Sequence, residues 1–333
     1  MNEFVEPFER LLADIGTPQV VRAIEAGQAA TPLWNAIDAS GFLDAMIPES
    51  HGGYGMPLSQ VFGLAAAEGR YATPLPVGQT LLARAVIAMA GAQVPAGPIA
   101  IAAPAHEEQG GRIVCRHTPY ALVAEWVVAS LPGRWLLLPK AQAAVTPSGI
   151  HGSLHADLEW PSPSAASHTS SAAAPWREAA AVLAAAQMAG AMERVLEMTL
   201  QFANDRVQFG RSIGKFQAIQ HQLAVMAENV PAARMAAQIG FDAQGPFPQP
   251  LRAAAAKARA SEAAALVAPM AHAIHGAIGV TAELDLQLFT RRLHDWRADF
   301  GSERAWNTVL GRALLASGNV TLDFMRTQLL PTS

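Results

Sequence analysis

The 333-residue chain is poor in charge and nearly lacks cysteine, and these scarcities exclude several classes of protein. Charged residues make up 15% of the chain, and the formal net charge is −4. The basic residues are scattered, so nothing favours nucleic acid as a partner. Cys115 is the only cysteine, which excludes an internal disulfide and fits the reducing cytoplasm.

Long uninterrupted apolar runs are also missing. The acidic stretch 1–9 has no basic segment leading into an apolar run, so we expect no secretory signal. The alanine-rich segments are interrupted by charged residues such as Glu193 and Lys257, so we expect no membrane span. Hydrophobic residues nevertheless make up 51% of the chain, enough for a large core. The composition predicts a soluble, cytoplasmic protein.

The hydrophobic pattern predicts a mainly α protein with a small β domain. Residues 1–92 read as an N-terminal helical domain with short breaks. Residues 93–161 contain short apolar runs bounded by Gly and Pro, which are typical of strands. Residues 162–175 form a Ser/Ala/Pro-rich linker that we expect to be exposed and mobile. Long helical patterns joined by short turns over 176–333 predict an antiparallel four-helix bundle.

Four histidines of the predicted β domain have neither metal-ligand spacing nor nearby partners in the sequence: His106, His117, His151 and His155. We therefore expect them on the surface or in loops, and we expect no metal site.

The stretch Arg206–His221 contains the highest density of candidate ligand-binding residues in the sequence. Its sixteen residues include Gly, Arg, Lys, Phe and Gln side chains, and they lie where one long helical pattern ends and the next begins. Cationic side chains beside free amides at a helix start suit phosphate groups, and the rings could flank a flat heterocycle. A basic turn with glycine as the helix C-cap explains the same residues. The pattern alone leaves both interpretations open.

Three motifs in order resemble the acyl-CoA dehydrogenase family over nearly the whole chain. Ile47-Pro-Glu-Ser-His-Gly-Gly-Tyr-Gly resembles the family's Pro-Glu-x-x-Gly-Gly-x-Gly loop between N-terminal helices. Arg206-Val-Gln-Phe-Gly-Arg followed by Phe216-Gln-Ala-Ile-Gln-His resembles its Arg-x-x-Phe-Gly…Phe-Gln…Gln signature. Ile274-His-Gly-Ala-Ile-Gly-Val-Thr resembles the segment usually written Gln-x-x-Gly-Gly-x-Gly, although Ala273 stands where that segment has Gln.

The resemblance implies a fold and an activity. Family members have an N-terminal helical domain, a middle β domain and a C-terminal four-helix bundle. They bind FAD across a subunit interface and oxidise an acyl-CoA thioester to its 2,3-enoyl form, with a carboxylate as base. An electron-transfer flavoprotein is the implied acceptor.

Two departures from the family pattern concern the flavin platform and the base. No Thr-Glu-Pro-x-x-Gly-Ser-Asp-like loop precedes the short middle domain, and the segment that starts at Ala102 is a poor match. Phe300 stands where many members have the catalytic Glu before the Gly aligned with Gly301. Ala180 occupies the alternative position of that Glu. The nearby Asp299 and Glu178 are interpreted as surface or capping acids, which leaves the catalytic residue unknown.

This asymmetry resembles heterotetrameric acyl-CoA dehydrogenases of the steroid or bile-acid side-chain type. The resemblance implies that the chain contributes the ADP half of an FAD site, while a second dehydrogenase-like chain supplies the flavin platform and the catalytic Glu. Arg206 and Gln208 would reach the pyrophosphate. The remaining implied cofactor-binding residues would lie around the adenine and ribose: Phe209, Phe216, Gln217, Gly276 and Ala277.

Two alternatives stay open. The chain could be a self-sufficient homo-oligomeric dehydrogenase that uses a relocated carboxylate such as Asp299 or Glu178. It could also be a non-catalytic partner or scaffold protein that binds no flavin.

Overall fold

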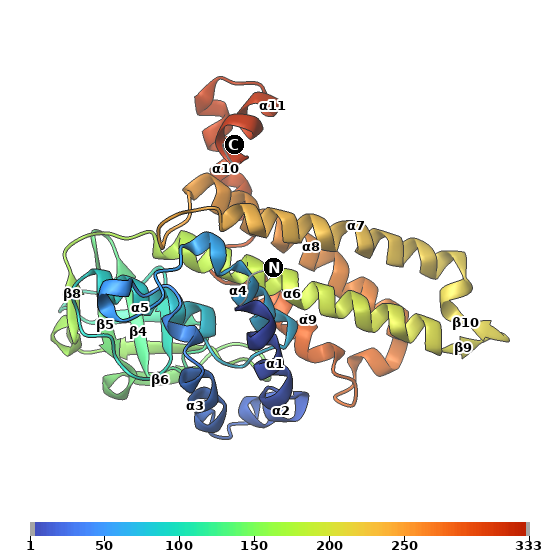
Figure 1. The fold of residues 1–333 in the computed structure, drawn as a ribbon, viewed down its shortest axis with the longest axis horizontal. Coiled ribbons are helices and arrows are strands. Elements are labelled where there is room, and N and C mark those ends of the chain that lie inside the picture. Colours follow the sequence, from blue (N-terminus) through green and yellow to red (C-terminus); the bar gives the residue numbers. More distant parts are fainter. Residues whose placement is uncertain (1–3, 331–333) are drawn as a thin grey trace.

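A computed structural model describes residues 4–330, and its elements follow the predicted order of helices, strands and bundle (Figure 1). The N-terminal part consists of helices with apolar faces turned inward, joined by short 3₁₀ turns. These helices are α1 (Val5–Ile15), α2 (Pro18–Glu25), α3 (Thr31–Ala39), α4 (Phe62–Arg70) and α5 (Val77–Met89). The predicted mainly α fold with a small β domain is confirmed, whereas the domain boundaries stay predictions.

The strands form two four-stranded sheets, with the orders β1-β4-β5-β8 and β2-β3-β7-β6. The β1–β4 pair is parallel, and the other pairs are antiparallel. A separate apolar core lies between the sheets and includes Ile113, Leu136 and Trp160. The strands are β1 (Ile99–Ala102), β2 (His106–Glu107), β3 (Ile113–Thr118), β4 (Trp126–Leu131), β5 (Arg134–Pro139), β6 (Ala144–Pro147), β7 (Ala156–Trp160) and β8 (His168–Ser170).

The segment 162–175, predicted to be an exposed and mobile linker, contains the short strand β8. It pairs with β5 through Trp135–Ser170, Leu136–Thr169 and Leu137–His168. Without β8, the backbone of β5 would present an unpaired edge. Hydrogen bonds to this edge order part of a segment whose composition is of low complexity.

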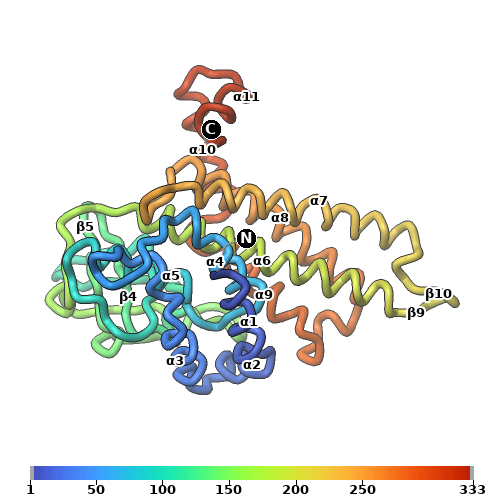
Figure 2. Tube along the Cα trace, viewed as in Figure 1, coloured from blue at the N-terminus to red at the C-terminus, as the bar shows by residue number. Residues whose placement is uncertain are grey.

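The bundle is formed by α6 (Trp176–Asp205), α7 (Gln217–Gly240), α8 (Pro250–His275) and α9 (Leu286–Ala298). The short hairpin of β9 (Val207–Gln208) and β10 (Arg211–Ser212) connects α6 to α7 at one end of the bundle (Figures 1 and 2). Helix α10 (Glu303–Ser317) leaves the bundle beside α8, and α11 (Thr321–Phe324) ends the projecting arm.

Helix α6 is the centre of the molecule, and small residues allow its neighbours to approach closely. A Cβ on Gly190 of α6 would lie 1.8 Å from the Ala66 carbonyl oxygen, and a Cβ on Gly69 of α4 would lie 1.9 Å from that of Gln187. Both distances are far shorter than any allowed contact, so the α4–α6 crossing requires glycine at both positions.

Two segments, α6 and 250–280, are long and apolar enough to cross a bilayer by length and composition alone. However, 83% of the apolar window of α6 is buried inside the protein, and α8 packs against α6 and α7. Packing in the bundle therefore accounts for the composition of α6, whereas 44% of the apolar window of 250–280 is buried.

Candidate functional site

A cavity of about 560 Å³ lies at the hairpin end of the bundle, between the end of α6, the β9–β10 hairpin and the end of α8. We call it the outer cavity. It brings together six of the seven residues that the sequence predicts for cofactor binding: Arg206, Gln208, Phe209, Phe216, Gly276 and Ala277. The seventh, Gln217, is the first residue of α7 and is exposed outside the cavity wall.

The aromatic wall of the outer cavity is unusually exposed. The Phe209 side chain is 92% exposed and its backbone has a φ of +51°. Its ring contacts that of Phe216 edge to face at 6.1 Å, and the Arg211 guanidinium lies 4.2 Å from the Phe216 ring centroid. An apolar ring held in solvent gains stability when a flat partner covers it.

Arg206 provides a free cationic group at the cavity edge. Its backbone is fixed, because its amide donates to the Phe202 carbonyl at 2.9 Å and its carbonyl accepts from Ile213 at 2.8 Å. Its side chain is exposed, and no carboxylate of the described residues lies within ion-pair distance of it. The guanidinium therefore remains available to an anion.

Sequence reasoning missed His275 and Phe202, which form the floor of this cavity. Their rings lie 4.4 Å apart at 30°. Burial lowers the pKa of His275, so the ring is neutral, and its Nδ1 donates to the Ala271 carbonyl at 2.8 Å. His275 stands inside the Ile274–Thr281 motif, and that position was the available signal.

Gly276 ends α8 with φ +66° and ψ −146°, a conformation open essentially to glycine alone. Its amide donates to the His272 carbonyl, so only its carbonyl can face a ligand. The outer cavity thus combines a free cation, an exposed ring and small backbone groups, and this donor set fits the adenine and phosphate groups of a dinucleotide such as FAD.

A second cavity, of about 510 Å³, lies where the strands meet the other end of the bundle. We call it the inner cavity. Its lining brings together two segments that the family resemblance had singled out: the loop at Ala102–Pro104 and the Phe300–Gly301 turn. Glu178, in the first turn of α6, lines neither cavity. Among the described residues that line the inner cavity, Asp299 is the only carboxylate.

Asp299 was predicted to be a surface or capping acid and His155 a surface or loop residue. Asp299 is the C-cap residue of α9 and His155 lies in the loop before β7, but neither lies at the surface. Each is only 5% exposed, and His155 Nε2 lies 2.9 Å and 3.2 Å from the two Asp299 carboxylate oxygens. Burial opposes a charged ring, but the charge and hydrogen bond of Asp299 outweigh it and raise the pKa of His155. The two residues stay together inside the protein because a buried charge requires a partner.

The backbone at the inner cavity is held by two further cations. Lys257 Nζ donates to the Gly301 carbonyl at 2.9 Å and to the Arg297 carbonyl at 3.0 Å, and Arg177 Nε donates to the Phe300 carbonyl at 3.2 Å. Burial lowers the pKa of Lys257 to about 7. The polar groups around this turn are thus largely satisfied by one another.

Comparison with known proteins indicates the family to which this architecture belongs. Residues 178–305 match the family described as acyl-CoA dehydrogenase, C-terminal domain. The chain is 31% identical over 304 residues to acyl-CoA dehydrogenase IpdE2 of Mycobacterium tuberculosis, an alignment that covers 87% of this chain and 89% of that one. A second IpdE2, from Mycolicibacterium smegmatis, is 41% identical over 117 residues, which are 35% of this chain and 36% of that one.

Solved structures show the same fold at lower identity. The ChsE4–ChsE5 complex from Mycobacterium tuberculosis aligns with a TM-score of 0.77 at 21% identity, covering 95% of this chain and 96% of that chain. A Tcur3481–Tcur3483 steroid acyl-CoA dehydrogenase variant gives 0.79 at 23% identity, covering 93% and 96%. Together with the near-complete alignment to IpdE2, the fold and the ordered motifs show that this chain belongs to the acyl-CoA dehydrogenase family.

Proposed function

We propose that the chain is one subunit of a heteromeric, FAD-dependent acyl-CoA dehydrogenase, in which it holds the ADP half of the cofactor. The observation that carries this proposal is the difference in free groups between the two cavities. At the outer cavity Arg206 has no carboxylate partner among the described residues and Phe209 is 92% exposed. At the inner cavity Asp299, the only carboxylate among the described residues of its lining, is hydrogen-bonded to His155. In this proposal a second chain supplies the catalytic base, because the carboxylate of this cavity is already paired.

Each residue of the outer cavity has a defined task in this proposal. Arg206 and Gln208 bind the pyrophosphate, and Phe209 and Phe216 flank the adenine. The backbone at Gly276 and Ala277 contacts the adenosine end. Gln217 meets only a ligand that extends out of the cavity, because it lies beyond the wall. FAD, when bound, supplies the hydride acceptor for oxidation of the acyl-CoA.

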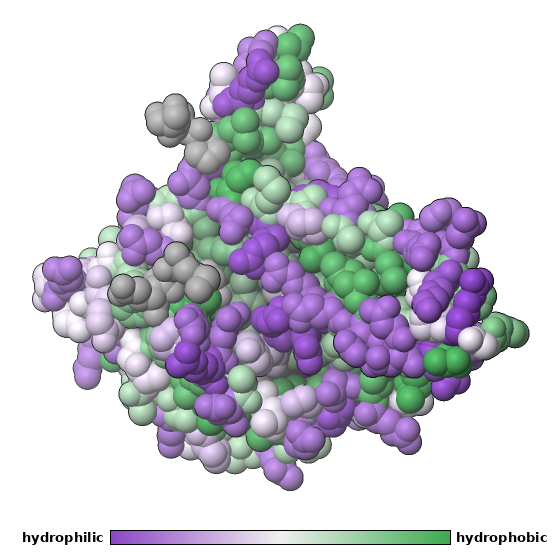
Figure 3. Space-filling view, turned by 45° about the vertical axis from the view of Figure 1, so that its right-hand side comes forward, coloured by the Kyte–Doolittle hydropathy of each residue, from purple (hydrophilic) through white to green (hydrophobic). Residues whose placement is uncertain are grey.

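Exposed apolar surface supports a partner chain. The projecting arm of α10 and α11 carries Leu315 at 85% and Val320 at 67% exposure, and Figure 3 shows hydrophobic surface on it. One similar structure is the ChsE4–ChsE5 complex, and another is a Tcur3481–Tcur3483 steroid acyl-CoA dehydrogenase. We infer a cytoplasmic heterotetramer with a second dehydrogenase-like chain. It acts on a bulky steroid-type acyl-CoA and passes electrons to an electron-transfer flavoprotein.

The test is flavin stoichiometry by native mass spectrometry and absorbance, with the chain expressed alone and with dehydrogenase-like chains encoded beside it. We expect a colourless chain alone, and a yellow complex that oxidises an acyl-CoA with about half the flavin of a homotetramer. A stable complex that never holds FAD would leave only a scaffold role.

A self-sufficient enzyme is the second candidate, because Asp299 does line the inner cavity. This second candidate would be supported if the chain alone held FAD and turned over an acyl-CoA, and if Asp299→Asn abolished that turnover.

A further inference from the structure

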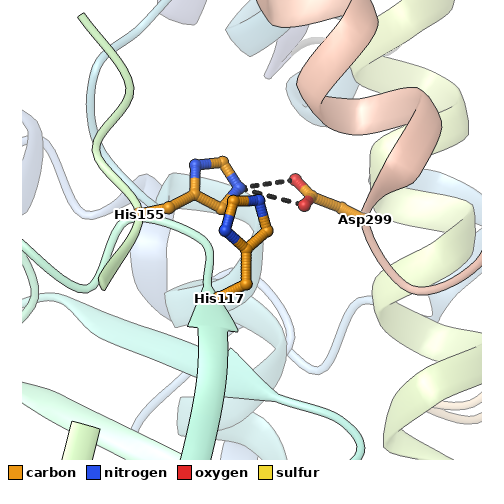
Figure 4. Close-up of side chains that lie close together, drawn as sticks. All are labelled: His117, His155 and Asp299. Atoms are coloured by element: carbon orange, nitrogen blue, oxygen red, sulfur yellow. Dashed lines mark hydrogen bonds and ion pairs between the residues drawn. The ribbon is translucent and has the colours of Figure 1, made fainter. Parts of the chain in front are cut away.

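Two histidines and an aspartate converge at the inner cavity from elements far apart in the chain. His117 ends the regular part of β3, His155 precedes β7, and Asp299 follows α9 (Figure 4). One ligand atom from each residue lies within 4.8 Å of the other two. We propose that this His117–His155–Asp299 cluster binds a divalent first-row transition-metal ion such as Zn²⁺.

Both histidines have a hydrogen-bonding partner at Nδ1, as metal-bound imidazoles commonly do. His117 Nδ1 lies 3.2 Å from Ser148 Oγ, and His155 Nδ1 lies 2.5 Å from Ser153 Oγ. A hydrogen bond at Nδ1 fixes the ring and leaves Nε2 as the ligand atom, and metal-bound imidazoles show the same arrangement. His155 Nε2 already faces Asp299.

The backbone at His117 is bent in a way that directs this side chain. Strand β3 has a register irregularity between Cys115 and Thr118, and His117 has a φ of +46°. Its amide donates to the Asp157 carboxylate at 2.7 Å, which holds the disfavoured conformation in place. As a result, the His117 ring stacks on that of His155, with centroids 4.4 Å apart at 23°.

One further carboxylate faces the cluster, and the arginines of the cavity are engaged elsewhere. Asp295 lies one helical turn before Asp299, and its carboxylate interacts electrostatically with both histidines. Arg116 lines the cavity, but it is paired with Asp157 at 3.1 Å and Glu159 at 2.9 Å. The other arginine of the cavity, Arg177, stacks over Trp306 at 4.5 Å.

Rotation of the His117 ring out of its stack on His155 completes the coordination, because two stacked imidazoles cannot both direct Nε2 at one ion. Bonds of about 2.0–2.1 Å from Zn²⁺ to nitrogen and oxygen place the ligand atoms of a tetrahedron about 3.4 Å apart. His155 Nε2 and Asp299 are 2.9–3.2 Å apart, so the exposed His117 ring makes the remaining adjustment. Two imidazoles and one carboxylate suit a first-row divalent ion and leave positions open toward the cavity. The ion would join the sheets to the end of the bundle.

Titration of the chelator-treated full chain with Co²⁺, and then with Zn²⁺, tests the site. We expect one Co²⁺ per chain, with visible absorption bands that Zn²⁺ removes. His117→Ala should weaken binding by at least about 100-fold, because removing a ligand costs more than disturbing its supporting hydrogen bond. His106→Ala, which changes an exposed histidine of β2 outside the cluster, should bind like the wild type.

Melting temperature provides an independent measurement. Zn²⁺ should raise the melting temperature of the wild type and of His106→Ala, but not that of His117→Ala, since binding to the native state stabilises it. Because His117 is exposed, its replacement leaves the core intact. Absence of stoichiometric binding, or equal binding by the wild type and His117→Ala, would overturn the proposal.

Discussion

The outer and inner cavities differ little in volume, about 560 and 510 Å³, but they differ in how their polar groups are engaged. They lie at opposite ends of α6, next to Arg206 and Arg177 respectively. The outer cavity keeps a free guanidinium and an exposed ring. In the inner cavity, Asp299, Arg177 and nearby Lys257 bond to other groups of the protein. The outer and inner cavities are therefore distinguished by whether their polar groups are free to bind a ligand, and not by their size.

The largest expected effect is at the inner cavity. Asp299→Ala removes the partner of buried His155 and should lower the free energy of unfolding by about 3 kcal/mol. Because Asp299 raises the pKa of His155, this stabilisation is fully present below the unfolded pKa of about 6.5 and is lost as pH rises through the folded value. Urea unfolding with chelator present should therefore show a larger loss at pH 6 than at pH 9. Glu228→Ala, on the exposed face of α7, is the control.

Arg206→Ala should act on binding and not on folding. Loss of a charge-assisted bond to phosphate, about 1.5–3 kcal/mol, should weaken FAD retention by the complex at least 10-fold. Urea unfolding of the chain alone should stay within about 0.5 kcal/mol of the wild type. Flavin released on ultrafiltration measures the first effect, and Arg194→Ala is an exposed control on α6, the helix that ends just before Arg206. A large stability loss would instead assign Arg206 to the fold.

Lys257, near the inner cavity, should make the free energy of unfolding rise with pH in the alkaline range. Burial lowers its folded pKa to about 7 from 10.5. The unfolded chain therefore binds more protons between these values, and stability due to this group should rise with pH. Lys257→Met should remove up to about 2 kcal/mol of this rise between pH 7.5 and 9. Parallel pH dependences in the two proteins would show that Lys257 is not responsible.

Phe209→Ala should have the smallest effect, about 1 kcal/mol on FAD binding, since one exposed ring contributes stacking alone. The melting temperature of the chain should not fall, because the ring is 92% exposed. Phe209→Trp should retain the flavin, which separates stacking from a specific shape requirement.

The sequence predicted the outer cavity better than the inner one, and the reason is the range of the interactions. Arg206 to Phe216 and Ile274 to Ala277 are two local motifs, each readable from consecutive residues. His155 and Asp299 are 144 positions apart, and neither has a local signal of burial. The left-handed backbone at His117 was equally hidden, because the partner strand and Asp157 impose it. The long helical patterns of the bundle were predicted because their periodicity is local, whereas β8 depends on an edge that only the folded sheet creates.

The glycine crossing of α4 and α6 also bears on how the protein unfolds and on how it can be divided. Backbone atoms of the two helices meet at Gly69 and Gly190. Phe62, at the start of α4, also contacts the Phe241 ring that follows α7. Removal of residues 1–92 would uncover the face of α6 that packs against α4. We therefore expect the N-terminal helices and the bundle to unfold as one cooperative unit, and we expect neither to fold if it is exchanged alone between relatives.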